Sequence, residues 1–134
     1  MTDVRRSDDD AEVMHIGEVA ARTELSIRSL RHWDEVGLIR PSGRTDGGFR
    51  LYTQADIDKI MTIRRMKPLG FTLEQMTVTM RDIEALHEPR AGQAPARERL
   101  TAVLADAEQR RAKLERQLGM ADEFLSRLSH QLTN

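Results

Sequence analysis

The stretch of sequence that decides the fold is residues 16–50, IGEVAARTELSIRSLRHWDEVGLIRPSGRTDGGFR. Its apolar positions have the spacing at which the two helices of a helix-turn-helix pack together. These positions are Val19, Ala20, Leu25, Leu30 and Trp33. The pattern predicts one helix over about 16–22 and a second over about 27–36. Ser26 is a suitable N-cap for the second helix, and Gly37 can end it in a left-handed conformation.

Two short strands are predicted after the second helix. Leu38-Ile39-Arg40 and Phe49-Arg50-Leu51-Tyr52 have strand-like composition, and Asp46-Gly47-Gly48 supplies a turn between them. When the second helix is packed on its apolar side, its polar side stays exposed. A helix of this kind, followed by a hairpin that carries arginines, has a shape that enters the major groove of DNA.

These motifs together resemble the winged-helix head of the mercury-resistance-regulator (MerR) family. The resemblance continues through Gly70-Phe71-Thr72-Leu73 and covers about residues 14–86. It implies a mainly α fold, in which a winged helix-turn-helix head is followed by a long dimerisation helix that forms an antiparallel coiled coil. It also implies a homodimeric transcription regulator that binds double-stranded DNA and RNA polymerase at a promoter and acts by bending and untwisting the promoter spacer.

The expected organisation has four parts. Residues 1–13 form a disordered acidic tail, 14–86 the winged helix-turn-helix domain, 87–96 a connector and 97–134 a coiled-coil helix. Within the domain, Thr53 opens a third helix that reaches about Leu69 and is kinked or shortened by Pro68. Thr72 opens a fourth. Glu24 departs from the family, because the turn position that it occupies favours glycine.

The C-terminal segment has a coiled-coil seam. Ten positions alternate spacings of four and three residues, and nine of them are apolar. They are Leu100, Leu104, Ala107, Arg111, Leu114, Leu118, Ala121, Leu125, Leu128 and Leu132. If two copies pair antiparallel about Arg116, Leu114 of one faces Leu118 of the other, and Arg111 lies over the small Ala121.

The candidate DNA-binding residues lie on the second helix and the hairpin. They are Ser26, Arg28, Ser29, Arg31, His32, Arg44, Arg50 and Tyr52. Several have a simpler alternative: the arginines can be ordinary surface charges, His32 can be merely exposed and Tyr52 can be a packing residue. Trp33 is expected in the core rather than on DNA. Lys59, Arg64, Arg65 and Lys67 are expected mostly on a solvated face, with one or two reaching phosphate.

Met76, Met80 and Ile83 are candidates for an effector pocket, although core packing explains them as well. Glu84 and His87 have the spacing of a carboxylate-bridged metal site, but such a site also needs a second pair of this kind and extra glutamates brought together in a helical bundle, so we expect no metal. No nucleophile–base pairing or phosphate-binding glycine loop indicates an enzyme, and no cofactor is expected. Any effector is unidentified.

The distribution of charge supports a DNA partner only for the predicted winged-helix head. The net charge of the 134 residues is −1, but residues 13–71 hold ten basic and seven acidic side chains. The chain has no cysteine, no long apolar run and no apolar signal core, and we expect a cytoplasmic protein without membrane association. Two other functions remain open. One is an architectural or chromosome-anchoring DNA-binding protein, and the other is a protein adaptor that recruits a different partner through the coil.

Overall fold

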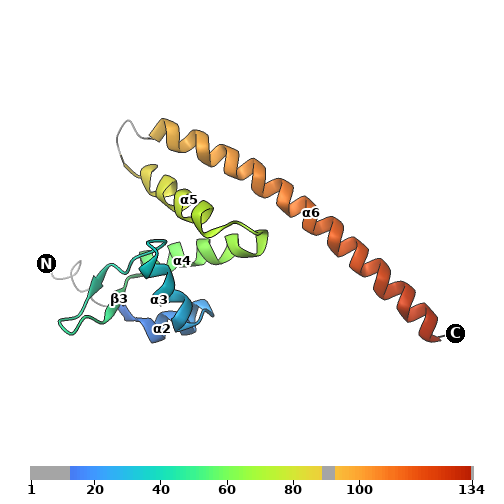
Figure 1. The fold of residues 1–134 in the computed structure, drawn as a ribbon, viewed down its shortest axis with the longest axis horizontal. Coiled ribbons are helices and arrows are strands. Elements are labelled where there is room, and N and C mark those ends of the chain that lie inside the picture. The colour runs from blue at the N-terminus through green and yellow to red at the C-terminus, as the bar shows by residue number, and fades with distance from the viewer. Residues whose placement is uncertain (1–12, 89–92, 134) are drawn as a thin grey trace, which may run out of the picture. The chain divides into compact units, whose positions relative to one another are not determined.

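The computed structural model describes residues 13–88 and 93–133. The chain divides between Arg81 and Asp82 into two compact units. The N-terminal unit holds a small three-stranded sheet and the helices that surround it, and the C-terminal unit consists mainly of the long helix α6 (Figure 1). None of the helices in the described ranges is both long and apolar enough to cross a membrane.

The helix-turn-helix is formed by α2 (Ile16–Thr23) and α3 (Ile27–Glu35). Val19, Leu30 and Trp33 are almost fully buried, which confirms the packing predicted from their spacing. The Ser26 hydroxyl caps α3 by accepting a hydrogen bond from the Ser29 amide at 3.0 Å. After α3, Gly37 has φ +79°, so the left-handed C-cap is also confirmed.

The predicted strand over Leu38–Arg40 is wrong. The amides of Leu38 and Ile39 both donate to the carbonyl of Trp33, at 2.9 and 3.3 Å, as part of the turn that closes α3. These amides are therefore unavailable to a strand ladder. Leu38 and Ile39 are apolar because they are buried in the core, not because they form a strand.

The sheet has the strand order β1-β3-β2 within the described residues. β3 (Arg50–Tyr52) pairs antiparallel with β2 (Gly43–Arg44) and with β1 (Met14–His15), a strand that the sequence analysis did not predict. Arg44 lies directly opposite Arg50 in the β2–β3 pairing. The turn between these strands is held by hydrogen bonds of Thr45 with Gly48 and Phe49, and Gly48 has φ +88°.

The two helices after the sheet begin and end where their sequence signals lie. α4 (Gln54–Met66) starts at a capping box of Thr53 and Asp56. At Pro68 the α-helix gives way to the short 3-10 helix η1 (Lys67–Leu69), which Gly70 ends at φ +86°. α5 (Leu73–Ala85) follows, and Thr72 and Gln75 exchange capping hydrogen bonds at its start.

α6 (Gln93–Thr133) is 41 residues long and begins four residues before the expected start at 97. Near its beginning, Arg99 donates two hydrogen bonds to the buried Asp82 carboxylate, at 2.9 and 2.7 Å. Arg99 thereby holds the pKa of Asp82 below its ordinary value, although burial opposes this effect. The expected tail over 1–13 falls almost entirely outside the described residues, as does part of the expected connector.

Glu24 generates a prediction about stability. It is the one non-glycine residue with positive φ in the described ranges, at φ +60°, and its carboxylate pairs with Arg64 at 2.8 Å. Glu24→Gly should raise the free energy of unfolding by about 1 kcal/mol, because a left-handed backbone costs other residues about that much. Loss of the exposed ion pair should cost less. Urea unfolding measures the change.

The matched control is Glu24→Gln, which removes the charge but keeps the strained backbone. It should change stability by less than about 1 kcal/mol. If Glu24→Gly were less stable than the wild type and than Glu24→Gln, the backbone at this turn would not be a source of strain.

Candidate nucleic-acid interface

The exposed side of α3 carries three of the predicted site residues close together. Arg28, Arg31 and His32 are all exposed, on the side of the helix away from the buried Leu30. They border an open hollow of about 800 Å³. The hollow is lined by Ile27, Arg28, Ser29, Arg31, His32, Trp33, Glu35 and Lys67. A basic, concave surface on an exposed helix suits a polyanionic backbone.

Ser26 and Ser29 are held by the capping of α3. The Ser26 hydroxyl donates to the Ser29 hydroxyl at 3.0 Å while it accepts from the Ser29 amide. The hydroxyl hydrogen of Ser29 is therefore the group of this pair that remains to donate to a base or phosphate.

Lys67 joins this surface from outside the helix-turn-helix. Its ammonium lies 5.6 Å from the centre of the Trp33 ring, at a distance typical of a cation–π contact. Trp33 itself is only 4% exposed, which agrees with its expected core role. The sequence analysis placed Lys67 in a weaker basic set. Its position just before Pro68, where α4 changes into η1, is the signal that could have singled it out.

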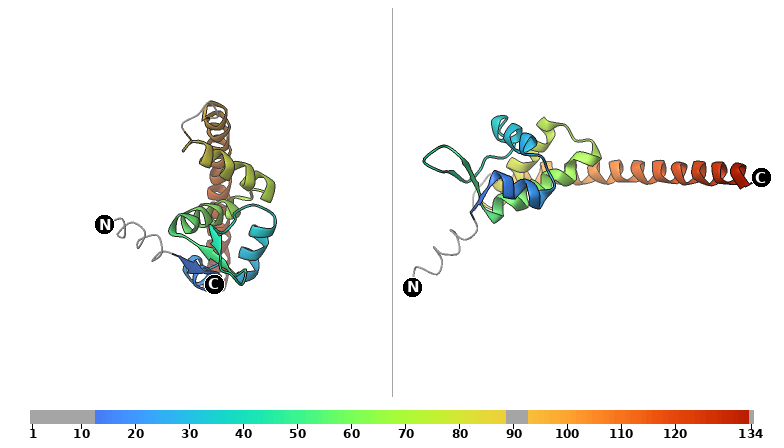
Figure 2. Two further views of the ribbon diagram at one scale, coloured as in Figure 1. Left: turned by 90° about the vertical axis from the view of Figure 1, so that its left-hand side faces the viewer. Right: turned by 90° about the horizontal axis from the view of Figure 1, so that it is seen from below.

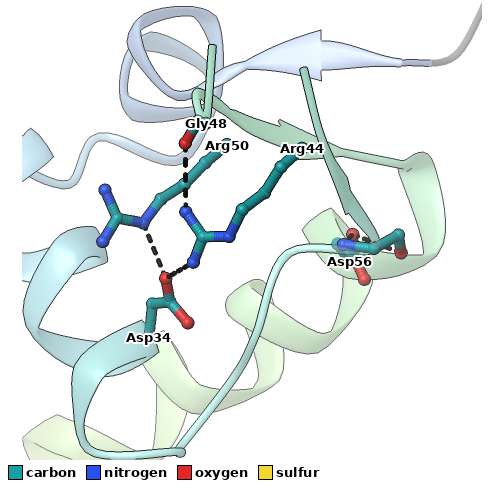
Figure 3. A network of polar contacts seen from close by, with 6 residues as sticks. Asp34, Arg44, Gly48, Arg50 and Asp56 are labelled. Carbon is teal, nitrogen blue, oxygen red and sulfur yellow. Dashed lines mark hydrogen bonds and ion pairs between the residues drawn. The ribbon is translucent and has the colours of Figure 1, made fainter. Parts of the chain in front are cut away.

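The wing is the hairpin of β2 and β3, and its two arginines share one carboxylate. Arg44 Nη2 and Arg50 Nε each donate to Asp34 Oδ2 at 2.7 Å (Figure 3). Arg44 also reaches the Gly48 carbonyl at 3.3 Å. The Asp34 side chain is 8% exposed, that of Arg50 20% and that of Arg44 45%. The two arginines are thus placed as predicted, but both are already bound to an acid.

Asp34 is a residue of this candidate site that the sequence analysis missed. Burial alone would raise its pKa, but the hydrogen bonds from Arg50 and Arg44 and their positive charges outweigh burial and lower the pKa. The carboxylate therefore remains charged while it is buried. One signal was available: Asp34 is in the last turn of α3, where the helix dipole disfavours an acid that has no cationic partner.

A second buried carboxylate holds the other end of the wing. Asp56 Oδ2 accepts hydrogen bonds from the amide and hydroxyl of Ser42, at 3.0 and 2.6 Å, and from the Thr53 amide at 3.0 Å. Ser42 precedes β2 and Thr53 follows β3, so Asp56 ties the two ends of the hairpin to the start of α4.

Tyr52 requires a correction. It is 1% exposed, and its hydroxyl is buried without a hydrogen-bond partner among the described residues. Burial also raises the pKa of this hydroxyl. An atom that is enclosed in the core cannot bind a DNA phosphate, so Tyr52 is a packing residue, the alternative left open in the sequence analysis.

Phe49 is an exposed aromatic residue that was predicted as part of a strand. It lies in the wing turn, with 70% of its surface exposed, next to Arg50. Figure 2 shows this turn standing clear of the helices of the N-terminal unit. The exposed ring is therefore accessible to a partner of the wing.

The other predicted sites lie on α5 and α6. Met76 and Met80 are 4% and 6% exposed and Ile83 is half-buried, as core packing requires. On α6 the large seam residues Leu104, Leu114, Leu118, Leu125, Leu128 and Leu132 are 43–79% exposed. Met120 and Phe124, 63% and 62% exposed, widen the apolar face beyond the predicted seam.

Comparison with known proteins identifies the family. The model of the MerR helix-turn-helix regulatory proteins matches residues 14–83, more than half of the chain. The chain belongs to the MerR family. The matched range includes α3, the wing, Asp34 and Lys67. The basic surface formed by α3, the wing and Lys67 therefore lies inside the MerR domain.

Curated MerR-type relatives differ in how much of their length this chain spans. It is 37% identical over 76 residues to the transcriptional activator TipA of Streptomyces coelicolor, covering 57% of this chain and 29% of TipA. It is 40% identical over 65 residues to the nodulation protein NolA of a Bradyrhizobium strain, covering 48% of this chain and 27% of NolA. With the regulator CueR of Salmonella typhi it shares 28% identity over 113 residues, 84% of this chain and 78% of CueR.

Solved MerR structures share the fold. The N-terminal part of the Bacillus subtilis multidrug transporter activator, MtaN, is 26% identical with a TM-score of 0.52, covering 90% of this chain and 99% of that chain. HiNmlR, a MerR regulator that lacks the sensor domain and was solved bound to promoter DNA, is 18% identical with a TM-score of 0.69. That alignment covers 85% of this chain and 88% of HiNmlR.

Proposed function

We propose that this MerR-family chain is a homodimeric, sequence-specific DNA-binding transcription regulator. The observation that carries the proposal is that α3 exposes Arg28 and Arg31 while Asp34, on the same helix, fixes the wing arginines beside it. A helix for the major groove and a wing for the backbone are thus held in one fixed arrangement. The DNA-bound structure of HiNmlR, which has the same fold, is consistent with this use of the head.

The groups on this surface suit different parts of DNA. Arg28 and Ser29, near the start of α3, are placed to read base edges, because the first turns of a recognition helix reach deepest into the groove. Arg31, His32 and Lys67 border the same hollow and are suited to phosphates. In the wing, Arg44 is suited to phosphate, and the exposed ring of Phe49 to the apolar edge of the sugars.

The apolar face of α6 supports the homodimer. The helix has 41 residues and is therefore about 60 Å long. Its exposed leucines form an apolar face that needs a partner to cover it. The most economical partner is the α6 helix of a second copy, with Arg111 already paired to Glu115 of its own chain at 3.1 Å. A two-fold dimer would read a pseudo-palindromic site.

Action at the promoter follows from family membership as a further part of the proposal. The dimer would bind in the promoter spacer, bend and untwist it, and work with RNA polymerase in the cytoplasm. An effector, if one exists, would bind near α5, around Met76, Met80 and Ile83, or at the dimer interface.

Selection of binding sites from random duplexes tests the function. We expect an inverted repeat. Arg28→Ala should weaken binding to the selected site by at least about tenfold and reduce the preference over a scrambled duplex, because a base-reading arginine contributes about 1–3 kcal/mol of discrimination. Arg50→Ala should weaken binding to both duplexes, because it removes a wing cation whose attraction to phosphates is indifferent to sequence.

Arg97→Ala, which removes an exposed arginine at the start of α6, is the matched control and should bind as the wild type. Failure to select any site would overturn the sequence-specific function. Equal losses on both duplexes for Arg28→Ala would remove this residue from base reading.

Pairs of cysteines test the coil. With Leu114→Cys and Leu118→Cys in the same chain, position 114 of one copy should crosslink to 118 of the other, because the antiparallel register about Arg116 makes them neighbours. Each single variant should crosslink poorly to itself. Efficient 114–114 crosslinking, measured by gel mobility after oxidation, would instead indicate a parallel pair or another register.

A further inference from the structure

The wing contains an unfavourable arrangement of charge that α3 corrects. Arg44 and Arg50 are directly opposite on neighbouring strands, where like charges repel. Asp34 reaches the pair from α3, and one of its oxygens accepts a hydrogen bond from each guanidinium. The two arginines are thereby held in place, and the group of three side chains carries a net charge of +1 instead of +2.

The two arginines are not equivalent in this arrangement. Arg50 is 20% exposed and binds through Nε, so it acts as the fixed strut between wing and helix. Arg44 is 45% exposed and uses one terminal nitrogen on Asp34 and the other on the Gly48 carbonyl at the longer distance of 3.3 Å. Arg44 is therefore the arginine that a phosphate can take over from Asp34 with little rearrangement.

We propose that Asp34 is a specificity-determining residue that acts through the wing arginines. It holds them where a correctly docked phosphate meets Arg44, and it cancels one of their charges in the free protein. Because attraction to phosphates is indifferent to sequence, this cancellation reduces binding to non-specific DNA more than binding to the correct site. The inference rests on the proposed DNA-binding function and adds to it a residue that touches no base.

The test compares salt dependence on two duplexes, the selected site and a scrambled sequence. Asp34→Asn keeps the shape of the side chain but removes its charge, which frees one cation per head. For the scrambled duplex, the slope of log affinity against log salt should then steepen by about 2 per dimer, at about 0.9 per phosphate. The affinity should fall about tenfold more than for wild type between 50 and 200 mM salt. At low salt, the preference for the selected site should fall by about tenfold, because the affinity for non-specific DNA rises and the wing is no longer held against α3.

Asp46→Asn is the matched control. Asp46 is an exposed acid in the same hairpin turn, and its replacement changes the net charge equally. Within the described ranges it forms no ion pair with the wing arginines, both of which pair with Asp34 instead. It should leave both the slope and the preference unchanged, because it frees no cation.

A second pair of variants separates charge from position and keeps the test valid if Asp34→Asn folds poorly. Arg44→Gln alone should make the scrambled-duplex slope shallower by about 2 per dimer. Asp34→Asn combined with Arg44→Gln should restore the wild-type slope, since the net charge is again +1, but not the wild-type preference.

The outcomes discriminate clearly. A wild-type slope for Arg44→Gln, a wild-type preference for Asp34→Asn, or equal effects of Asp34→Asn and Asp46→Asn would each overturn the role of Asp34. Absence of any DNA binding by the wild-type protein would instead overturn the proposed function.

Discussion

The proposed DNA-binding surface depends on the ion pairs between one buried carboxylate and two arginines. Asp34 lies in the last turn of α3, and Arg44 and Arg50 belong to adjacent strands of the wing, so these bonds link α3 directly to the hairpin. Desolvation makes such a pair weak as a source of stability but strict in geometry. The main effect of Asp34 is therefore to set the orientation of the wing, and Asp56, which binds both ends of the hairpin, completes the frame.

This arrangement links the fold to its function. Trp33 and Leu30 bury one side of α3, which leaves Arg28 and Arg31 exposed on another, and the cap at Gly37 turns the chain toward the wing. Lys67 reaches the same surface because Pro68 changes the end of α4 into a 3-10 turn. The basic surface is therefore assembled from three separate segments whose positions are fixed by core packing and two buried acids.

Local signals were sufficient to predict most of the fold. Helix caps at Ser26, Thr53 and Thr72, the break at Pro68 and the strain at Glu24 are properties of short segments, and all are seen in the structure. The errors concern features that depend on the packed structure rather than on a short sequence pattern. Leu38 and Ile39 look like a strand, but their amides close a helix, and β1 is too short to have a pattern. The arginines that bind Asp34 lie 10 and 16 residues from it in the sequence, so no local pattern links them. The burial of Tyr52 likewise depends on neighbours from the whole domain.

The most direct test of this account is the pKa of the Asp34 carboxyl group, measured by NMR titration in the free protein. If both arginines bind the buried carboxylate, its pKa lies below the ordinary value of 3.8. In Arg50→Gln the pKa should rise, because burial then opposes ionisation with only Arg44 to offset it. A wild-type pKa at or above 3.8, or a pKa that does not change when Arg50 is replaced, would contradict the coupling of wing and recognition helix through Asp34.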